Sequence, residues 1–493
     1  MKGSNCRPCI ILALTITILA FVSLLRIEGN FGSVAIKNID LFSSISKSAA
    51  PAKAVREPVP GTDPSDATEK KAQADGVSGI IDPDMNKIIL NNKNNQGSLE
   101  YFFDALYRAE EYGGKVRIAY FGDSIIEGDL ISQDLRKNLQ AQFGGKGVGF
   151  VPITSVAPRS RNTINHTFSN NWQVAALHPK FNERHMPGIS GFTFLPTSDT
   201  FISGPDDSGQ TKAYKYSWVE YEASKLFENT NSFSVVKLYY GPVTDFAFIK
   251  YVIDNDAARV VNLPRGEMVR ELAIKGLNQA RKIKISFFAK DSAEIYGVSF
   301  EENGGVYVDN FSIRGYSGLS LNKLPGSMLA DFDSFLKYKL IIIHYGVNIS
   351  GFTTKPEFIW YRNRMIEVVE HLKGAFPRAS FLIVSVNDIA VKQGTELTTK
   401  PSIPLLVEAQ RQIARQTGAA FWNLYEAMGG ADSMASWVKG KNPLASKDCI
   451  HFSHRGGKKV ADLLTKALLK EYKAYKAKRI ANNNGKYNQR NGK

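Results

Sequence analysis

The chain has 493 residues and a formal net charge of +15 at pH 7. Its 43% hydrophobic and 22% charged residues are ordinary for a globular protein and exclude a wholly disordered chain or a multi-span membrane protein. Because one hydrophobic core rarely grows to this size, we expect two folded domains joined to flexible segments. The positive charge favours anionic neighbours, but much of it lies in the tails, so we expect no nucleic-acid partner.

The N-terminus predicts an export signal or membrane anchor. Residues 1–8 are basic, and residues 9–25 follow as an apolar run without a charge. No small-x-small cleavage site directly follows Leu25, which favours an uncleaved anchor in the inner membrane, with secretion after cleavage as the alternative. Since the positive charges precede the run, residues 1–8 are expected in the cytoplasm and the bulk of the chain in the periplasm or otherwise outside the cytoplasm.

The three cysteines allow no disulfide framework in the exported part. Cys6 and Cys9 lie in or beside the predicted anchor, which leaves Cys449 alone. A free cysteine usually behaves as a small buried hydrophobe, so we expect Cys449 to be a packing residue rather than a reactive thiol.

Two segments have the composition of disordered chain. Residues 43–96 are rich in Ala, Ser, Lys, Asp and Pro, with few aromatic residues, and predict a disordered linker. Residues 471–493 are dominated by Lys, Asn, Tyr and Arg and predict a basic disordered tail.

The pattern between these segments changes twice. In residues 97–169, a helical pattern from Leu99 precedes a short apolar run, Val116–Phe121, and helical spacing then continues to Phe143. Residues 170–309 contain mostly short strand-like runs, which predict a β-sandwich. In residues 310–470, strands and helices alternate again. We therefore expect a three-layer α/β/α fold with a parallel sheet, interrupted by an inserted jelly-roll-like β-sandwich for which glycan binding is a candidate role.

Ser124 is the candidate nucleophile. It follows the apolar run in Gly122-Asp123-Ser124, where a strand meets a helix, and α/β sheets place their ligand sites at the carboxyl ends of such strands. A serine hydroxyl needs a base and a group that orients the base.

Asp448 and His451 are the candidate orienting carboxylate and base. They are three residues apart, which on a helical turn would put both side chains on one face. Each motif alone is weak, because Gly-Asp-Ser is common in turns and Asp-x-x-His is often a helix cap with a surface histidine. A metal site that also uses His454 is a further alternative, although no fourth ligand motif is recognisable and we expect no metal.

Four blocks in order give the chain its resemblance to the SGNH/GDSL hydrolase family. They are Gly122-Asp123-Ser124, the segment 310–315, Gly346-Val347-Asn348 and Asp448-x-x-His451. The resemblance implies an oxyanion hole made by the backbone N–H groups of Ser124 and Gly315 and by the Asn348 side chain. Such donors would stabilise the negative charge of a tetrahedral intermediate. Gly318 is close enough to be an alternative to Gly315.

The first block resembles most the bacterial peptidoglycan O-acetylesterases that have an inserted carbohydrate-binding-like β domain. The extended motif runs from Gly122 to Asp129, and a β-rich segment stands between the first and second blocks. Two departures leave the substrate open: Ile125 stands where many members of that branch have a histidine, and Ile349 where the wider family often has an acidic residue.

These patterns together predict a serine esterase that removes O-acetyl groups from a cell-envelope glycan, with peptidoglycan as the leading substrate. The resemblance implies an acetyl-serine intermediate and no cofactor. An O-acetyltransferase with the same triad and a non-catalytic glycan-binding envelope protein are the two alternatives. The expected partners are an acetylated polysaccharide or peptidoglycan and, through residues 9–25, the membrane.

Overall fold

The computed structural model describes residues 29–31, 34–36, 85–91, 97–177, 185–203, 211–351 and 355–491. The chain divides into two compact units, Met1–Gly76 and Val77–Lys493. In the first, β1 (Gly29–Phe31) pairs antiparallel with β2 (Val34–Ile36). The predicted anchor at residues 9–25 lies outside the described residues. None of the helices in the described ranges has the length and apolar character needed to cross a membrane.

A six-stranded sheet forms the centre of the second unit, in the order β17-β4-β18-β19-β22-β3. Five of its strands are parallel, and the edge strand β3 runs antiparallel to β22. The bounds are β3 (Ile88–Ile89), β4 (Lys115–Gly122), β17 (Gly305–Ser312), β18 (Tyr338–His344), β19 (Ser380–Val384) and β22 (Ala420–Trp422).

The prediction of a disordered linker over residues 43–96 is wrong at β3, which is an ordered strand within that segment. Ile88 is buried in the core, and the Asn86 side chain donates a hydrogen bond to the Leu463 carbonyl and accepts one from the Trp422 indole at 3.0 Å. These tertiary contacts order a short segment whose own composition favours disorder.

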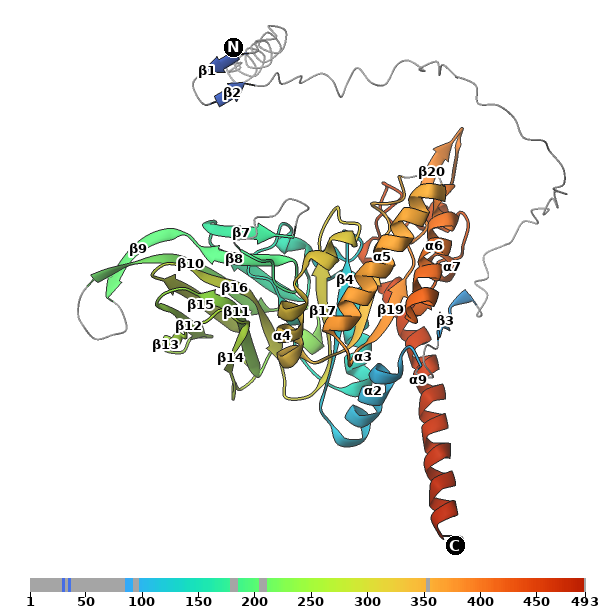
Figure 1. Cartoon of the computed structure of the whole chain (residues 1–493), viewed down its shortest axis with the longest axis horizontal. Helices are drawn as coiled ribbons and strands as arrows, with labels where there is room; N and C mark the ends of the chain where they lie inside the picture. Colours follow the sequence, from blue (N-terminus) through green and yellow to red (C-terminus); the bar gives the residue numbers. More distant parts are fainter. Residues whose placement is uncertain are drawn as a thin grey trace, which may run out of the picture. The chain divides into compact units, whose positions relative to one another are not determined.

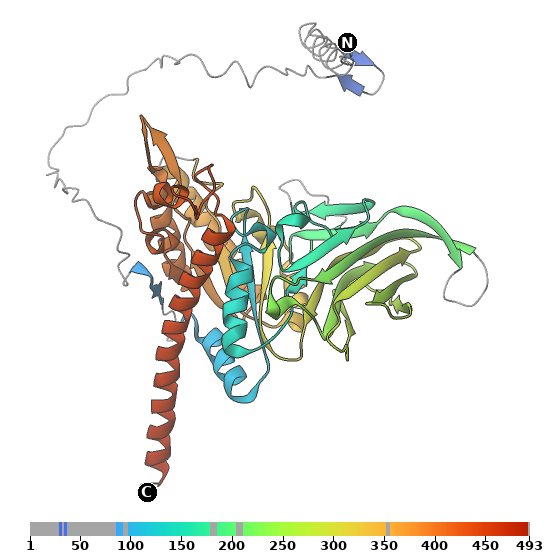
Figure 2. The same cartoon turned by 180° about the vertical axis from the view of Figure 1, so that it is seen from behind.

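Helices cover both faces of the central sheet. The helices α2 (Glu100–Tyr112), α3 (Ser132–Phe143) and α9 (His454–Asn491) lie on one face, and α4 (Gly326–Leu336), α5 (Lys355–Ala375) and α6 (Ser402–Thr417) lie on the other (Figures 1 and 2). Successive residues of β4 alternate between the two hydrophobic cores, with Tyr120 in one and Phe121 in the other. The arrangement is the three-layer α/β/α architecture predicted from the sequence.

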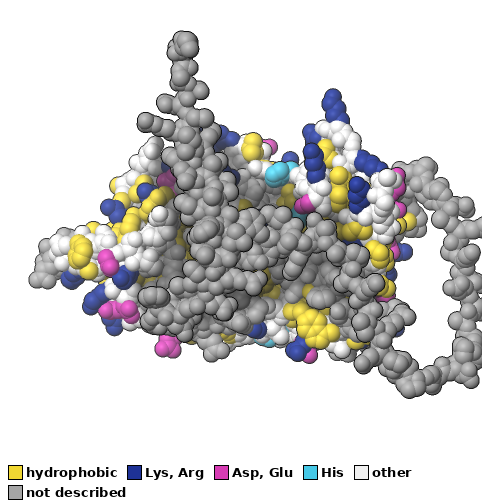
Figure 3. Space-filling view, turned by 90° about the horizontal axis from the view of Figure 1, so that it is seen from above, with side chains coloured by type: hydrophobic (Ala, Val, Ile, Leu, Met, Phe, Trp, Pro, Cys, Tyr) yellow, Lys and Arg dark blue, Asp and Glu magenta, His cyan; other side chains and the backbone are white. Residues whose placement is uncertain are grey.

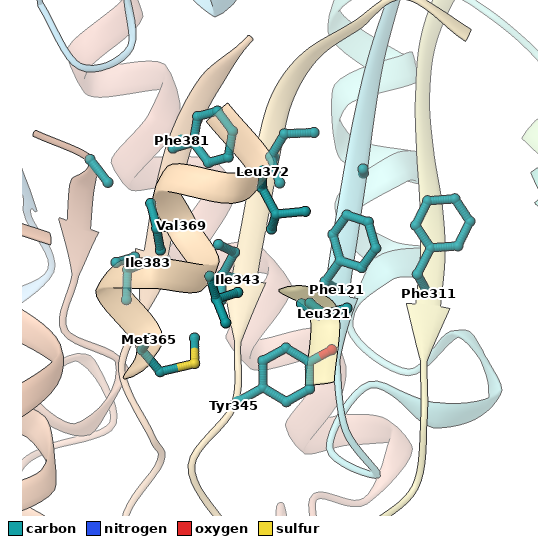
Figure 4. Packing of buried hydrophobic residues seen from close by; sticks show 14 of the residues in the cluster. Phe121, Phe311, Leu321, Ile343, Tyr345, Met365, Val369, Leu372, Phe381 and Ile383 are labelled. Atoms are coloured by element: carbon teal, nitrogen blue, oxygen red, sulfur yellow. The ribbon is translucent and has the colours of Figure 1, made fainter. Parts of the chain in front are cut away.

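The core between the sheet and α5 contains large apolar side chains from both. Met365, Val369 and Leu372 of α5 point toward Ile343 of β18 and Ile383 of β19 (Figure 4). All five are nearly inaccessible to solvent. This packing fixes the strands whose carboxyl ends form the site described below.

Two antiparallel sheets account for the strands between β4 and β17. One has the order β13-β12-β15-β10-β6 with β9 beside β10, and the other has the order β14-β11-β16-β8-β7 with β5 beside β16. Their buried side chains form a common hydrophobic cluster. The bounds are β5 (Gly149–Val151), β6 (Ile164–Phe168), β7 (Trp172–Ala176), β8 (Phe192–Pro196), β9 (Ser198–Ser203), β10 (Thr211–Ala223), β11 (Val235–Val243), β12 (Ala247–Ile253), β13 (Arg259–Leu263), β14 (Arg270–Ile274), β15 (Lys282–Ala289) and β16 (Ala293–Glu301).

The sheets do not follow the boundaries expected for residues 170–309. Strands β5 and β6 precede residue 170 and already belong to the antiparallel sheets, whereas β17 begins at Gly305 and belongs to the central sheet. Short strands such as β5 have no long apolar pattern, so only their pairing with a distant strand, here β16, defines them.

The predicted disordered tail, residues 471–493, is wrong over its described part, because α9 continues to Asn491. The Tyr472 ring is buried against Phe103 and Phe143, with ring centroids 5.9 and 5.5 Å away, and Arg479 pairs with Asp104 of α2. The Ala, Lys and Glu residues favour a helix, and these contacts stabilise it. Figure 2 shows α9 beside α3 and continuing past it.

The remaining described elements are short. The hairpin of β20 (Ala390–Gln393) and β21 (Glu396–Thr399) follows β19, and α7 (Leu424–Ala427) and α8 (Ser433–Val438) follow β22. The 3-10 turns are η3 (Glu127–Asp129), η4 (Pro158–Ser160), η5 (Glu228–Thr230) and η6 (Leu319–Lys323).

Candidate active site

Ser124 lies in the turn that follows β4, at the carboxyl edge of the parallel sheet. The turn is tight: a Cβ atom on Gly122 would come within 2.8 Å of the Ile126 side chain and 2.9 Å of the His344 carbonyl. Only glycine fits there. The turn leaves the Ser124 side chain half-buried and open to partners from other loops.

Ser124, His451 and Asp448 form a continuous hydrogen-bonded chain. The Ser124 Oγ lies 2.9 Å from His451 Nε2, and His451 Nδ1 lies 2.7 Å from Asp448 Oδ2. This is the order of nucleophile, base and orienting carboxylate that serine catalysis requires. The structure therefore brings together the three residues predicted from the sequence, although Ser124 is separated from His451 by 327 positions.

The Asp448–His451 pair lies in a non-helical turn before α9, not on the helical turn that the spacing suggested. Asp448 Oδ1 accepts the backbone N–H groups of Ile450 at 2.9 Å and His451 at 3.0 Å. Cys449 has a φ of +60°, which an α-helix does not allow. These hydrogen bonds, rather than helical periodicity, place both side chains on one side of the turn.

The turn determines the charge, burial and exposure of its side chains. Partial burial raises the pKa of Asp448, but the hydrogen bonds from His451 and Ile450 outweigh it and hold the pKa below the usual value, so Asp448 is ionised at neutral pH. Cys449 is buried in the hydrophobic core and forms no disulfide with any described residue, as expected for a packing residue. The His451 and Asp448 side chains are 37% and 47% exposed, so substrate can reach the pair.

Asp123, the residue before the nucleophile, is buried. Its Oδ1 accepts the Ile125 N–H at 3.0 Å, and its Oδ2 accepts the Asn348 side-chain amide at 3.2 Å. Burial raises the pKa of Asp123 to about 7, against the lowering effects of the Ile125 and Gly346 N–H groups, His451 and Asn348. The sequence predicts no separate role for Asp123, and its place in Gly-Asp-Ser is the one signal that points to it.

The predicted oxyanion donors come from three loops at the same edge of the sheet. Asn348 follows β18, and its Nδ2 donates to the Tyr316 carbonyl at 2.8 Å as well as to Asp123. Both amide hydrogens are therefore engaged, and one must be released to bind an oxyanion. In the described part of the chain, the backbone N–H groups of Ser124 and Gly315 have no acceptor and are available.

Gly315 and Gly318 differ in their surroundings. Both have a positive φ, +80° and +85°, which favours glycine. A Cβ on Gly318 would lie 2.7 Å from the Tyr345 ring, whereas nothing lies within 4 Å of a Cβ on Gly315. Gly318 is thus a close-packing position, and Gly315 is exposed in the loop that also contributes the Tyr316 carbonyl.

The face of the molecule seen from above carries side chains of every type where the described residues are visible. Figure 3 shows basic, acidic and apolar side chains interspersed on the visible described surface, with histidine atoms reaching solvent among them. The described residues include no group of three or more His, Cys, Asp or Glu that could hold a metal ion. His454 lies 3.4 Å from the Asn162 side-chain amide.

The solved structures that match the chain include two proteins named as esterases. A peptidoglycan O-acetylesterase matches with a TM-score of 0.60 and 21% identity, over 76% of this chain and 96% of that protein. A family two carbohydrate esterase from Cellvibrio japonicus matches with a TM-score of 0.25 and 9% identity, over 63% of this chain and 98% of that protein. No protein-family model and no curated protein matches the chain.

The first of these similarities extends over three quarters of the chain and shows a shared fold. The similarity to bacterial peptidoglycan O-acetylesterases expected from the sequence is therefore confirmed at the level of the fold. Fold alone does not determine activity, which depends on the residues of the site.

Proposed function

We propose that the protein is an SGNH-type serine esterase that removes O-acetyl groups from a cell-envelope glycan, with peptidoglycan as the leading substrate. The observation that carries this proposal is the Ser124–His451–Asp448 chain, with separations of 2.9 and 2.7 Å, at the carboxyl edge of the parallel sheet. A non-catalytic glycan-binding protein has no need for these separations, so the geometry favours an enzyme.

The proposed reaction has two halves. His451 Nε2 takes the proton of Ser124 Oγ as the oxygen attacks the acetyl carbonyl, and the same proton passes to the sugar oxygen as the C–O bond breaks. Water then attacks the acetyl-serine, His451 takes its proton, and acetate leaves as the proton returns to Ser124. Ionised Asp448 holds the imidazole in position and stabilises its protonated form.

The oxyanion of each tetrahedral intermediate would be bound by the N–H groups of Ser124 and Gly315 and by Asn348. The Asn348 side-chain amide would be the third donor. To bind the oxyanion, it would give up its hydrogen bond to either the Tyr316 carbonyl or Asp123. The geometry requires no cofactor for either half-reaction.

The proposed location and domain roles follow the sequence. We propose that residues 9–25 anchor the chain in the inner membrane and that the catalytic part works outside the cytoplasm. The two antiparallel sheets would act as an inserted β-sandwich domain that contacts glycan. Centrifugation can separate the soluble from the membrane fraction for the full chain and for a chain without residues 1–25. We expect only the full chain in the membrane fraction.

The decisive test is acetate release. Wild type and Ser124→Ala are compared on O-acetylated peptidoglycan, an O-acetylated neutral glycan and a small acetyl ester. We expect release by wild type only, and release that survives in Ser124→Ala would disprove the nucleophile. Acetyl transfer to an added sugar in place of release would identify a transferase with the same triad.

A further inference from the structure

A cavity lies near the proposed active site. Its volume is about 410 Å³, and it is lined by residues of β6, β7 and β8, of the segment 152–161, and of β17 with the loop that follows it. We call it the Arg161 pocket, and its lining residues include Glu127, Arg161, Val174, Phe192, Arg314 and Tyr316. Most of the remaining wall is apolar, including Phe194 and Ile313.

Several residues of the pocket wall are close in sequence to the residues of the proposed active site. Glu127 is three residues after Ser124, and its backbone N–H donates to the Ser124 carbonyl at 3.4 Å. Arg314 and Tyr316 flank Gly315, and the Tyr316 carbonyl accepts from Asn348. A glycan whose ester carbonyl lies at Ser124 would therefore place a neighbouring group in this pocket.

Arg161 is the unusual residue of the pocket. Its side chain is 10% exposed, yet within the described ranges its guanidinium makes no hydrogen bond. Its closest charged partner is Asp129, with 3.9 Å between Nη1 and Oδ2. Nη1 in particular is shielded from water and has no hydrogen-bond partner in the described ranges, which costs free energy because its two donors lose their water. Such a group is best explained by a ligand that supplies acceptors.

Asp129 does not neutralise Arg161 because it is already held by another arginine. Two hydrogen bonds of 2.8 Å join it to Arg136, and Ser132 and Thr163 donate to it as well. The buried group of Asp129, Arg136 and Arg161 thus carries one excess positive charge.

The other charged residues near the pocket do not neutralise this excess positive charge. Glu127 pairs with Arg314 at the mouth, and Asp309, the other carboxylate that acts on Arg161, pairs with Arg117 at 2.6 Å. Burial lowers the pKa of His166 to about 4, so this pocket residue is neutral at pH 7. An anionic ligand group is therefore favoured.

We propose that the Arg161 pocket binds the carboxylate-bearing sugar part of the substrate, with the Arg161 guanidinium donating hydrogen bonds to that carboxylate. The apolar wall would contact the carbon face of the sugar. This inference rests on the proposed esterase function and narrows it to acetyl esters of acidic glycans. The buried Ser190 hydroxyl, which also lines the pocket and has no partner among the described residues, is available as a second donor.

The first experiment compares kcat/KM for three acetyl esters: O-acetylated peptidoglycan fragments with free lactyl carboxylates, O-acetylated polygalacturonate and acetylated xylan, which is neutral. We expect wild type to prefer one or both acidic substrates, and which of them it prefers distinguishes a lactyl from a uronic carboxylate. In Arg161→Met, the ratio of acidic to neutral kcat/KM should fall at least tenfold. Arg159→Met removes a nearby exposed arginine and should keep the wild-type ratio.

Equal loss on acidic and neutral esters in Arg161→Met, or a wild-type preference for xylan, would overturn the proposal. Arg161→Met also removes a buried charge next to Asp129, which affects folding. Ala176→Phe therefore provides a second variant, which fills the pocket and should also lower the ratio.

The second experiment does not depend on turnover. Calorimetric binding of N-acetylmuramic acid and of galacturonic acid is measured on Ser124→Ala protein and on the double variant with Arg161→Met. We expect binding of at least one acid, weakened at least tenfold in the double variant. Equal binding in both proteins rejects the pocket, whereas acetate release by Ser124→Ala rejects the esterase function separately.

Discussion

The triad and the Arg161 pocket differ in solvent exposure and in hydrogen bonding. The triad lies at an open edge, where His451 and Asp448 are 37% and 47% exposed and every ring nitrogen and carboxylate oxygen has a partner. The pocket holds a charge that is nine-tenths buried and makes no hydrogen bond within the described residues. The comparison indicates that the protein itself supplies the hydrogen bonds that orient a reacting group. For a ligand-binding group, the ligand supplies them.

The largest effect should come from the triad itself. Ser124→Ala removes the only oxygen that forms the covalent intermediate, so kcat/KM for a small acetyl ester should fall at least about 1,000-fold. Steady-state acetate release measures it. Thermal unfolding of the variant serves as the control for folding, and a loss of less than tenfold would show that the exposed edge is not the catalytic one.

Asp123 should produce the next largest effect, on stability. Its pKa of about 7 in the folded state exceeds the unfolded value of about 3.9, so the folded state binds more protons between these values. Its contribution is present below pH 4 and is lost as pH rises through 7, by up to about 4 kcal/mol at about 1.4 kcal/mol per pKa unit.

Urea unfolding of wild type and Asp123→Asn at pH 4.5, 6 and 8 checks this contribution. The free energy of unfolding of wild type should fall with rising pH relative to that of the variant. Identical pH dependence in the two proteins would show that Asp123 ionises normally despite its burial.

Asn348 connects the two regions, since it donates both to Asp123 and to the Tyr316 carbonyl beside the pocket. Asn348→Ala should lower kcat about 100-fold, the effect of losing one oxyanion donor, with little change in KM. Pre-steady-state and steady-state kinetics with a chromogenic acetyl ester measure the split. An effect on KM alone would assign Asn348 to the pocket and not to the oxyanion.

The smallest effect is expected at the mouth of the pocket. Arg314 is 65% exposed, so its ion pair with Glu127 is weak, of the order of 1 kcal/mol or less. Glu127→Gln should change kcat/KM for an acidic glycan ester by less than about fivefold. A much larger change, measured by the same acetate assay, would indicate that Arg314 rather than Arg161 binds the carboxylate of the substrate.

Part of the fold was predictable because local patterns and tertiary packing agree. The apolar run Val116–Phe121 lies within β4, and the spacing up to Phe143 forms α3. Patterns failed where distant partners decide: β3 is ordered by β22, and α9 extends through residues 471–491 because Tyr472 and Arg479 contact α2. Composition alone cannot report such contacts.

The sequence by itself determined the chemistry of the edge: a serine after a buried strand, and a histidine with an aspartate three positions before it. These short motifs can be recognised in the sequence because local backbone geometry holds each of them. The turn at Gly122 and the hydrogen bonds of Asp448 are examples. Only the tertiary structure decided that Asp123 is buried and that Arg161 lines a pocket next to Ser124. Burial and missing partners arise from elements far apart in the chain, so no local pattern encodes them.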